Sequence, residues 1–161
     1  MEDIYKTMDK LNKTVDELNE LIGKLPWCDF DYLGMSGKNL EIAGGLDLFY
    51  PNPDSYDIRI IFEDIFYISS LMSWNTDTSK KFLKILDGDE FNIMNKKYQV
   101  EQGNYIFVFS SIENHIEDLY YIIARNIRYE IVDTFQFEKR ENRLVKNNLN
   151  SKYNLIFKNF L

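Results

Sequence analysis

The sequence predicts an α+β fold in which an N-terminal amphipathic helix packs on a twisted, mostly antiparallel sheet, followed by a C-terminal helix. Two spacing patterns support this prediction. Apolar residues recur with helical spacing over residues 4–25 and again over 138–161, and they alternate with a period of two over much of residues 40–132. Aromatic residues make up 16% of the chain, which favours a sheet over a purely helical bundle.

The size and composition indicate one domain, residues 1–161, with a core of its own. A chain of this length buries about two-thirds of its unfolded surface, so it needs no disulfide or metal for stability. Cys28 is the only cysteine, and an intrachain disulfide is therefore excluded. The N-terminus lacks a signal-peptide pattern, and no apolar run reaches the roughly 18 residues of a membrane span. We therefore expect a cytoplasmic protein, and the abundance of Asn, Lys, Ile and Tyr is typical of an AT-rich bacterial genome.

The first predicted element is a helix over residues 4–25, which ends at Gly23 and Pro26. Its apolar stripe follows the alternating spacing of four and three that defines a heptad repeat. We favour a single helix lying across a sheet in a monomer, because three heptads are short and their flanks show no clear pairing of opposite charges. The alternative is a coiled coil that forms a homodimer. The stripe consists of Ile4, Met8, Leu11, Val15, Leu18, Ile22 and Leu25.

Strands are predicted next. Residues 40–50 alternate with a period of two, and Gly44-Gly45 inside them suggests a bulge or a strong twist. Residues 51–55 are predicted to form a turn, and residues 56–74 are the most apolar stretch. Its central pair, Glu63-Asp64, is interpreted as the loop between two antiparallel strands, with a bulge in one long strand as the alternative. A catalytic carboxylate pair needs surroundings that separate the two pKa values, which two solvated neighbours do not provide.

The remaining elements are read from turn and capping signals. Residues 78–88 predict a short helix that starts at Thr78 or Ser79 and ends near Gly88. Residues 98–100 and 105–110 predict strands on either side of a Gly103-Asn104 turn. Residues 119–132 fit a strand or a helix, and their Tyr, Ile and Val content favours the strand. The basic tail, residues 138–161, is either a packed helix or a partly mobile partner-binding segment.

Motifs for metal, cofactor or catalytic chemistry are missing from the sequence. The single histidine, His115, excludes a two-histidine metal centre, and the single cysteine excludes cysteine-rich zinc sites. A nucleophilic pair of Cys28 and His115 is disfavoured because the neighbouring Asp29 raises the pKa of the thiol. "GMSGKN" lacks the spacing of a phosphate loop, and "DGDE" at 87–90 lacks the ligand pattern of a calcium loop. We therefore expect no catalytic residue, no metal and no cofactor.

The charge distribution points to a protein partner. The net charge is −7, and because residues 138–161 carry +4 the rest of the chain carries −11. Such a body repels nucleic acid and anionic membranes and suits a basic protein. The acidic residues expected at the interface lie beside aromatic residues that would anchor in a partner's pocket. These two predicted sets are Trp27, Asp29 and Asp31, and Asp87, Asp89, Glu90 and Phe91.

The stretch "LEIAGGLDLFYPNPDSYDIRIIFEDIFYIS", residues 40–69, resembles the immunity proteins of bacterial polymorphic-toxin systems. Those proteins are small, cytoplasmic, often acidic and non-enzymatic, and they block a toxin by direct binding. The resemblance is one of general pattern and assigns no functional residue. It implies a non-catalytic protein-binding module. The alternative function is an enzyme or a small-ligand-binding protein with a site in a sheet-lined pocket.

Overall fold

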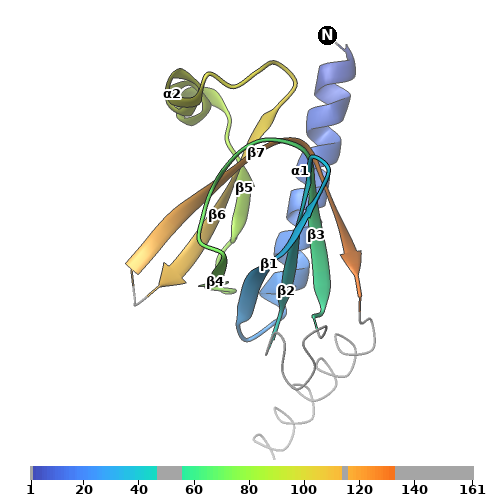
Figure 1. Cartoon of the computed structure of the whole chain (residues 1–161), viewed down its shortest axis with the longest axis vertical. Coiled ribbons are helices and arrows are strands. Elements are labelled where there is room, and N and C mark those ends of the chain that lie inside the picture. The colour runs from blue at the N-terminus through green and yellow to red at the C-terminus, as the bar shows by residue number, and fades with distance from the viewer. Residues whose placement is uncertain (1, 47–55, 114–115, 133–161) are drawn as a thin grey trace, which may run out of the picture.

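The computed structural model describes residues 2–46, 56–113 and 116–132 and confirms the α+β class (Figure 1). It contains two helices, α1 (Glu2–Gly23) and α2 (Gly88–Tyr98), in this part of the chain. The strands are β1 (Cys28–Ser36), β2 (Asn39–Gly45), β3 (Ile58–Ser69), β4 (Ser73–Thr76), β5 (Leu83–Ile85), β6 (Tyr105–Glu113) and β7 (Ile116–Ile131). They form one antiparallel sheet in the order β4-β1-β2-β3-β7-β6-β5. The predicted turn at 51–55 and the predicted C-terminal helix at 138–161 lie outside the described residues.

The sheet curls so strongly that non-neighbouring strands meet across its concave face. β2, β3 and β7 lie between β1 and β6 in the strand order, yet the rings of Phe30 and Phe109 are 5.8 Å apart. Near the open edges, the hydroxyl of Thr76 in β4 donates to the carbonyl of Ser110 in β6 at 2.8 Å. The concave face therefore encloses an aromatic core. Its rings include Phe30, Phe62, Trp74, Phe82, Phe107 and Phe109.

α1 closes the concave side of the sheet with its apolar stripe. Leu11, Val15, Leu18 and Ile22 are buried in the same cluster as the aromatic rings of the strands. A polar contact adds to this packing, because the Tyr129 hydroxyl on β7 donates to Glu17 Oε2 at 3.1 Å. Since the chain's own sheet covers these stripe positions, they cannot also form the seam of a coiled coil. The interpretation as a single helix on a sheet is confirmed for this part of the stripe.

Gly44 serves close packing rather than a bulge. The register of β2 is continuous through Gly44 with both β1 and β3, so of the two predicted alternatives, a bulge or a strong twist, the bulge is wrong. A Cβ atom built on Gly44 would lie 2.8 Å from Phe30 Cε1 and 2.9 Å from Ile58 Cγ2. Gly44 therefore allows β2 to pack closely against the aromatic core, where a side chain would collide with Phe30 and Ile58.

The prediction of two strands joined at Glu63-Asp64 is also wrong. β3 is one strand that pairs with β7 on both sides of this position, and its register shifts between Ile65 and Tyr67. Asp64 has a φ of 57°, but the register with β7 is continuous across it, with Glu63 opposite Asn126 and Ile65 opposite Ala124. Continuous pairing with a long partner strand outweighs the local turn signal, and the alternative of a bulge in one strand is correct.

The predicted helix over 78–88 is wrong as well. Residues 83–85 form β5, which pairs with β6, and Gly88 with a φ of 50° begins α2 instead of ending a helix. The predicted strand at 98–100 is wrong too, because Tyr98 is the last residue of α2. The strands predicted at 105–110 and 119–132 are confirmed as parts of β6 and β7.

Candidate functional site

α2 packs on the opposite face of the sheet from α1. Ile106 and Val108 of β6 point to this face, whereas Phe107 between them points into the concave core. Phe91 and Met94 of α2 lie against the same small cluster. The sheet therefore has a helix on each face (Figure 1).

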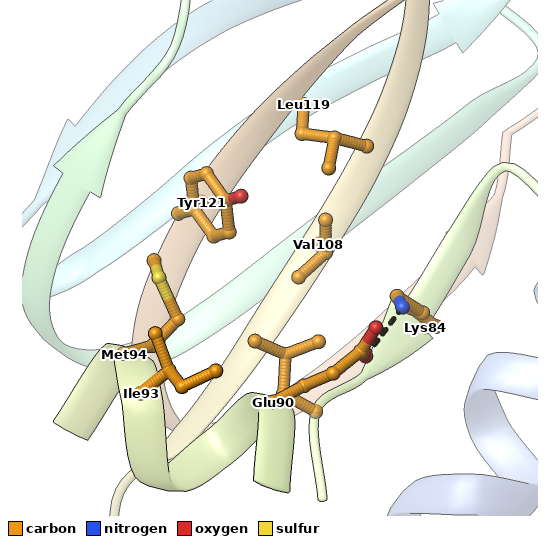
Figure 2. Close-up of a pocket in the computed structure, with 8 residues that line it drawn as sticks. Lys84, Glu90, Ile93, Met94, Val108, Leu119 and Tyr121 are labelled. Atoms are coloured by element: carbon orange, nitrogen blue, oxygen red, sulfur yellow. Dashed lines mark hydrogen bonds and ion pairs between the residues drawn. The ribbon is translucent and has the colours of Figure 1, made fainter.

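An apolar groove lies beside α2 where the convex face is left open (Figure 2). Its volume is about 180 Å³. Two of its apolar walls are open to solvent, because Ile93 is 68% exposed and Leu119 is 52% exposed. Leu86 and Val108 form a buried floor. The lining residues are Lys84, Leu86, Glu90, Ile93, Met94, Val108, Leu119 and Tyr121.

One side of the groove is charged. Figure 2 shows the ion pair between Lys84 Nζ and Glu90 Oε2, which are 2.6 Å apart. Asp87 and Asp89 are exposed within one turn of Glu90, at the N-terminal end of α2. Acidic residues at this end and Lys96 and Lys97 in the last turn both complement the helix dipole. Because Lys84 balances only Glu90, this end of the groove keeps a negative charge.

The second predicted set is thus brought together, although Phe91 has a different role from the one expected. The sequence predicted that Phe91 would be an exposed anchor. Its ring is half-buried and packs on the convex cluster, so it holds α2 to the sheet. The exposed apolar residue of this helix is Ile93, which the sequence analysis missed. Ile93 stands off the stripe formed by Phe91, Met94 and Tyr98, and an apolar residue off the stripe of a short helix was the available signal.

The first predicted set lies elsewhere, on β1 and the loop before it. Trp27 is 47% exposed. Asp29 and Asp31 alternate with the buried Cys28 and Phe30, so their side chains point away from the core. β1 is hydrogen-bonded to β2 and β4, whereas α2 packs on β6 and β7. The two predicted sets therefore form separate surface regions rather than one site.

The surroundings of Cys28 do not favour a nucleophilic thiol. Cys28 is fully buried, and burial, together with the charges of Asp29 and Asp57, raises the pKa of its thiol far above the ordinary range. His115 lies outside the described residues. Among the residues that are described, no group of three or more His, Cys, Asp or Glu side chains is arranged to hold a metal ion.

Glu63 and Asp64 belong to a surface network of ion pairs. Glu63 accepts hydrogen bonds from Asn126 Nδ2 at 2.7 Å and from Arg128 Nε at 2.8 Å, and these bonds lower its pKa. Asp64 Oδ2 lies 3.6 Å from Arg125 Nε. Each carboxylate lies beside an arginine. The pair therefore lacks the two contrasting environments that a catalytic acid and a catalytic base need.

Two larger hollows flank α1. One, of about 530 Å³, lies between the C-terminal half of α1 and residues 78–81, and the other, of about 520 Å³, lies between its N-terminal half and Arg125-Asn126. Both are open and lined mainly by polar side chains. The groove beside α2 is smaller than either, and its volume of about 180 Å³ falls below the roughly 300–1,000 Å³ of small-molecule sites.

No described helix is long and apolar enough to cross a membrane. No protein-family model, curated protein or solved structure matches the chain. In the described part of the chain, the fold is a curled antiparallel sheet with α1 on one face and α2 on the other, and an acidic, partly apolar surface lies beside α2.

Proposed function

We propose that the protein is a non-catalytic binding module that meets a basic protein partner through the N-terminal end of α2. One observation carries the proposal: the exposed acidic residues Asp87, Asp89 and Glu90 adjoin two exposed apolar side chains, Ile93 and Leu119. Protein interfaces combine an apolar centre with a charged rim in this way. The acidic rim steers the encounter, and the apolar side chains lose their contact with water when the partner binds.

The resemblance of residues 40–69 to immunity proteins suggests the specific form of this function. In that case the partner is a toxin with a basic surface, and binding neutralises it by covering the surface that the toxin uses. The charge of −11 outside the basic tail supports such a pairing, because complementary fields raise the association rate. A metal or cofactor plays no part in the proposal.

The test begins with identification of the partner. The tagged full-length chain is expressed in its native host, and the proteins that co-purify are identified and produced in pure form. Association rates are then measured at several salt concentrations for the wild type and for the triple variant Asp87→Lys/Asp89→Lys/Glu90→Lys. We expect slower association for the variant at low salt. The difference should shrink at higher salt, as the Debye length falls to about 8 Å.

A matched control separates the site from the overall charge. The variant Asp9→Lys/Asp16→Lys/Glu20→Lys changes the net charge by the same amount on the exposed face of α1. This control should slow association much less than the α2 variant. An acidic partner, or equal effects of the two triple variants, would show that the proposed surface is wrong.

A further inference from the structure

We infer that the partner inserts one large apolar side chain, flanked by lysine or arginine, into the groove beside α2. This inference rests on the proposed function and specifies what the surface recognises. The sequence pattern predicted that this protein supplies the anchoring side chain here, Phe91. Because Phe91 is packed on its own sheet, the roles are reversed, and this protein supplies the pocket.

The size of the groove limits what it can hold. An apolar cavity of about 150 Å³ accommodates benzene. The groove, at about 180 Å³, therefore has room for one aromatic ring or one branched aliphatic side chain. Cofactors and most metabolites need sites of roughly 300 Å³ or more.

The walls match an apolar side chain. The floor of Leu86 and Val108 is already dry, and Met94 beside it has a flexible side chain that adapts to differently shaped neighbours. An inserted ring would also cover Ile93 and Leu119, which are open to water in the isolated chain (Figure 2). Among the described residues that line the groove, the charged ones are Lys84 and Glu90, which form an ion pair with each other.

The charge around the groove specifies the flanks of the inserted side chain. Within the described part of the chain, neither Asp87 nor Asp89 makes an ion pair. Both are exposed next to the groove, so a basic residue beside the inserted side chain would meet them. A second copy of this chain is a poor occupant. A two-fold dimer through this surface would place the same acidic residues opposite each other, where they repel.

Three synthetic peptides of equal length test this inference on the full-length protein labelled with ¹⁵N. The first has one phenylalanine with two lysines on each side, the second replaces the phenylalanine with alanine, and the third replaces the lysines with glutamates. We expect the first peptide to shift the amide signals of residues 84–94, 106–108 and 119–121 in a saturable way. Its affinity should exceed that of either other peptide at least tenfold. Shifts centred elsewhere, or equal binding of the alanine peptide, would overturn the inference.

Two groove variants and a control make the test specific. Ile93→Asn removes one wall and Leu119→Asn removes the other, and both side chains are exposed enough that the fold should persist. Each should weaken binding of the phenylalanine peptide at least tenfold. Met72→Asn changes a side chain that is 69% exposed outside the groove and should leave the affinity unchanged. Unchanged affinity in both groove variants would contradict the inference.

Rate measurements with the native partner distinguish failure of this inference from failure of the proposed function. The Asp87, Asp89 and Glu90 reversal tests the function through the association rate, whereas Ile93→Asn tests the inserted side chain through the dissociation rate. If only the reversal has an effect, the proposed function stands and the inserted side chain is wrong. If neither variant has an effect, the proposed function itself is wrong.

Discussion

The side-chain amide of Asn19 on α1 pairs with the main chain of Leu83 in the way that a neighbouring strand would. Its Nδ2 donates to the Leu83 carbonyl at 2.8 Å, and the Leu83 N–H donates to its Oδ1 at 3.1 Å. The same Nδ2 also donates to the carbonyl of Val15 at 2.9 Å, which fixes the rotamer. β5 is the last strand in the sheet order, and its free edge could pair with another strand. The Asn19 side chain instead pairs with the main-chain groups of Leu83 at this edge.

Replacing Asn19 with alanine should destabilise the protein by at least about 2 kcal/mol. The change leaves the N–H and carbonyl of the buried Leu83 without partners, and each unpaired buried group costs about 1–3 kcal/mol. Urea denaturation measures the free energy of unfolding. Asn12→Ala is the control, because Asn12 is an exposed asparagine of the same helix. Equal effects of the two substitutions would show that the pairing with Leu83 contributes nothing.

Replacing Gly44 with alanine should cost about 1–3 kcal/mol, the usual penalty for overpacking a core. The added methyl would lie under 3 Å from both Phe30 and Ile58, which belong to the aromatic core and have no room to move. Thermal unfolding followed by circular dichroism measures the effect. Gly23→Ala is the control, since the nearest atom to its new methyl is 3.6 Å away. A Gly44→Ala protein as stable as the wild type would mean that the strands can separate at this point.

Asp64 offers a test of backbone conformation. Its φ of 57° costs free energy for any residue with a side chain, so Asp64→Gly should stabilise the protein by up to about 1 kcal/mol. The lost contact with Arg125 joins two partly exposed side chains and is worth little. Asp64→Val should instead destabilise it by about 1–3 kcal/mol, because a β-branched residue is strained at positive φ. Urea denaturation of both variants gives the comparison, and the same sign for both would contradict the left-handed conformation of Asp64.

Stability should fall in acid through the surface ion-pair network of Arg59, Glu63, Arg128 and Glu130. Hydrogen bonds from Asn126 and Arg128 lower the pKa of Glu63, and those from Arg59 and Arg128 lower the pKa of Glu130. A carboxyl group whose pKa is lower in the folded chain stabilises the fold fully above its ordinary value, 4.5, and loses that contribution as the pH falls through the folded value.

The measurement is the free energy of unfolding between about pH 6 and pH 3. The loss over this range should be smaller in Glu63→Gln/Glu130→Gln than in the wild type. Asp9→Asn/Glu20→Gln removes two exposed carboxylates of α1 and should leave more of the pH dependence in place. If the first double variant loses as much stability in acid as the wild type, the network does not set the acid sensitivity.

The elements that sequence reasoning predicted well are those in which local pattern and tertiary packing agree. The stripe of α1 is regular, and every position from Leu11 to Leu25 is buried as expected. The segment around Gly88 shows the opposite case. Phe82, Leu83 and Leu86 fit one face of a helix, but pairing with β6 turns 83–85 into a strand. Glycine occurs at both ends of helices, so Gly88 alone did not show whether a helix begins or ends at this position.

The acidic part of the candidate site could be predicted from the sequence, but the groove could not. The acidic residues at 87–90 are adjacent in the chain, and their charge could be read directly. The groove beside them needs Val108 and Leu119 from two strands, and α2 must lie on the convex face. Those relationships depend on the register between β6 and β7, which local patterns do not specify.

The place of β7 in the sheet has a consequence for how the protein is made. β7 follows all the other described strands in the chain, yet it lies between β3 and β6 and pairs with both. While the ribosome is still adding residues 116–131, the apolar edge of β3 has no partner and the aromatic core cannot close. The nascent chain therefore passes through a stage in which strand edges and aromatic side chains are open to aggregation or to chaperones. Folding of the sheet has to wait until β7 has been synthesised.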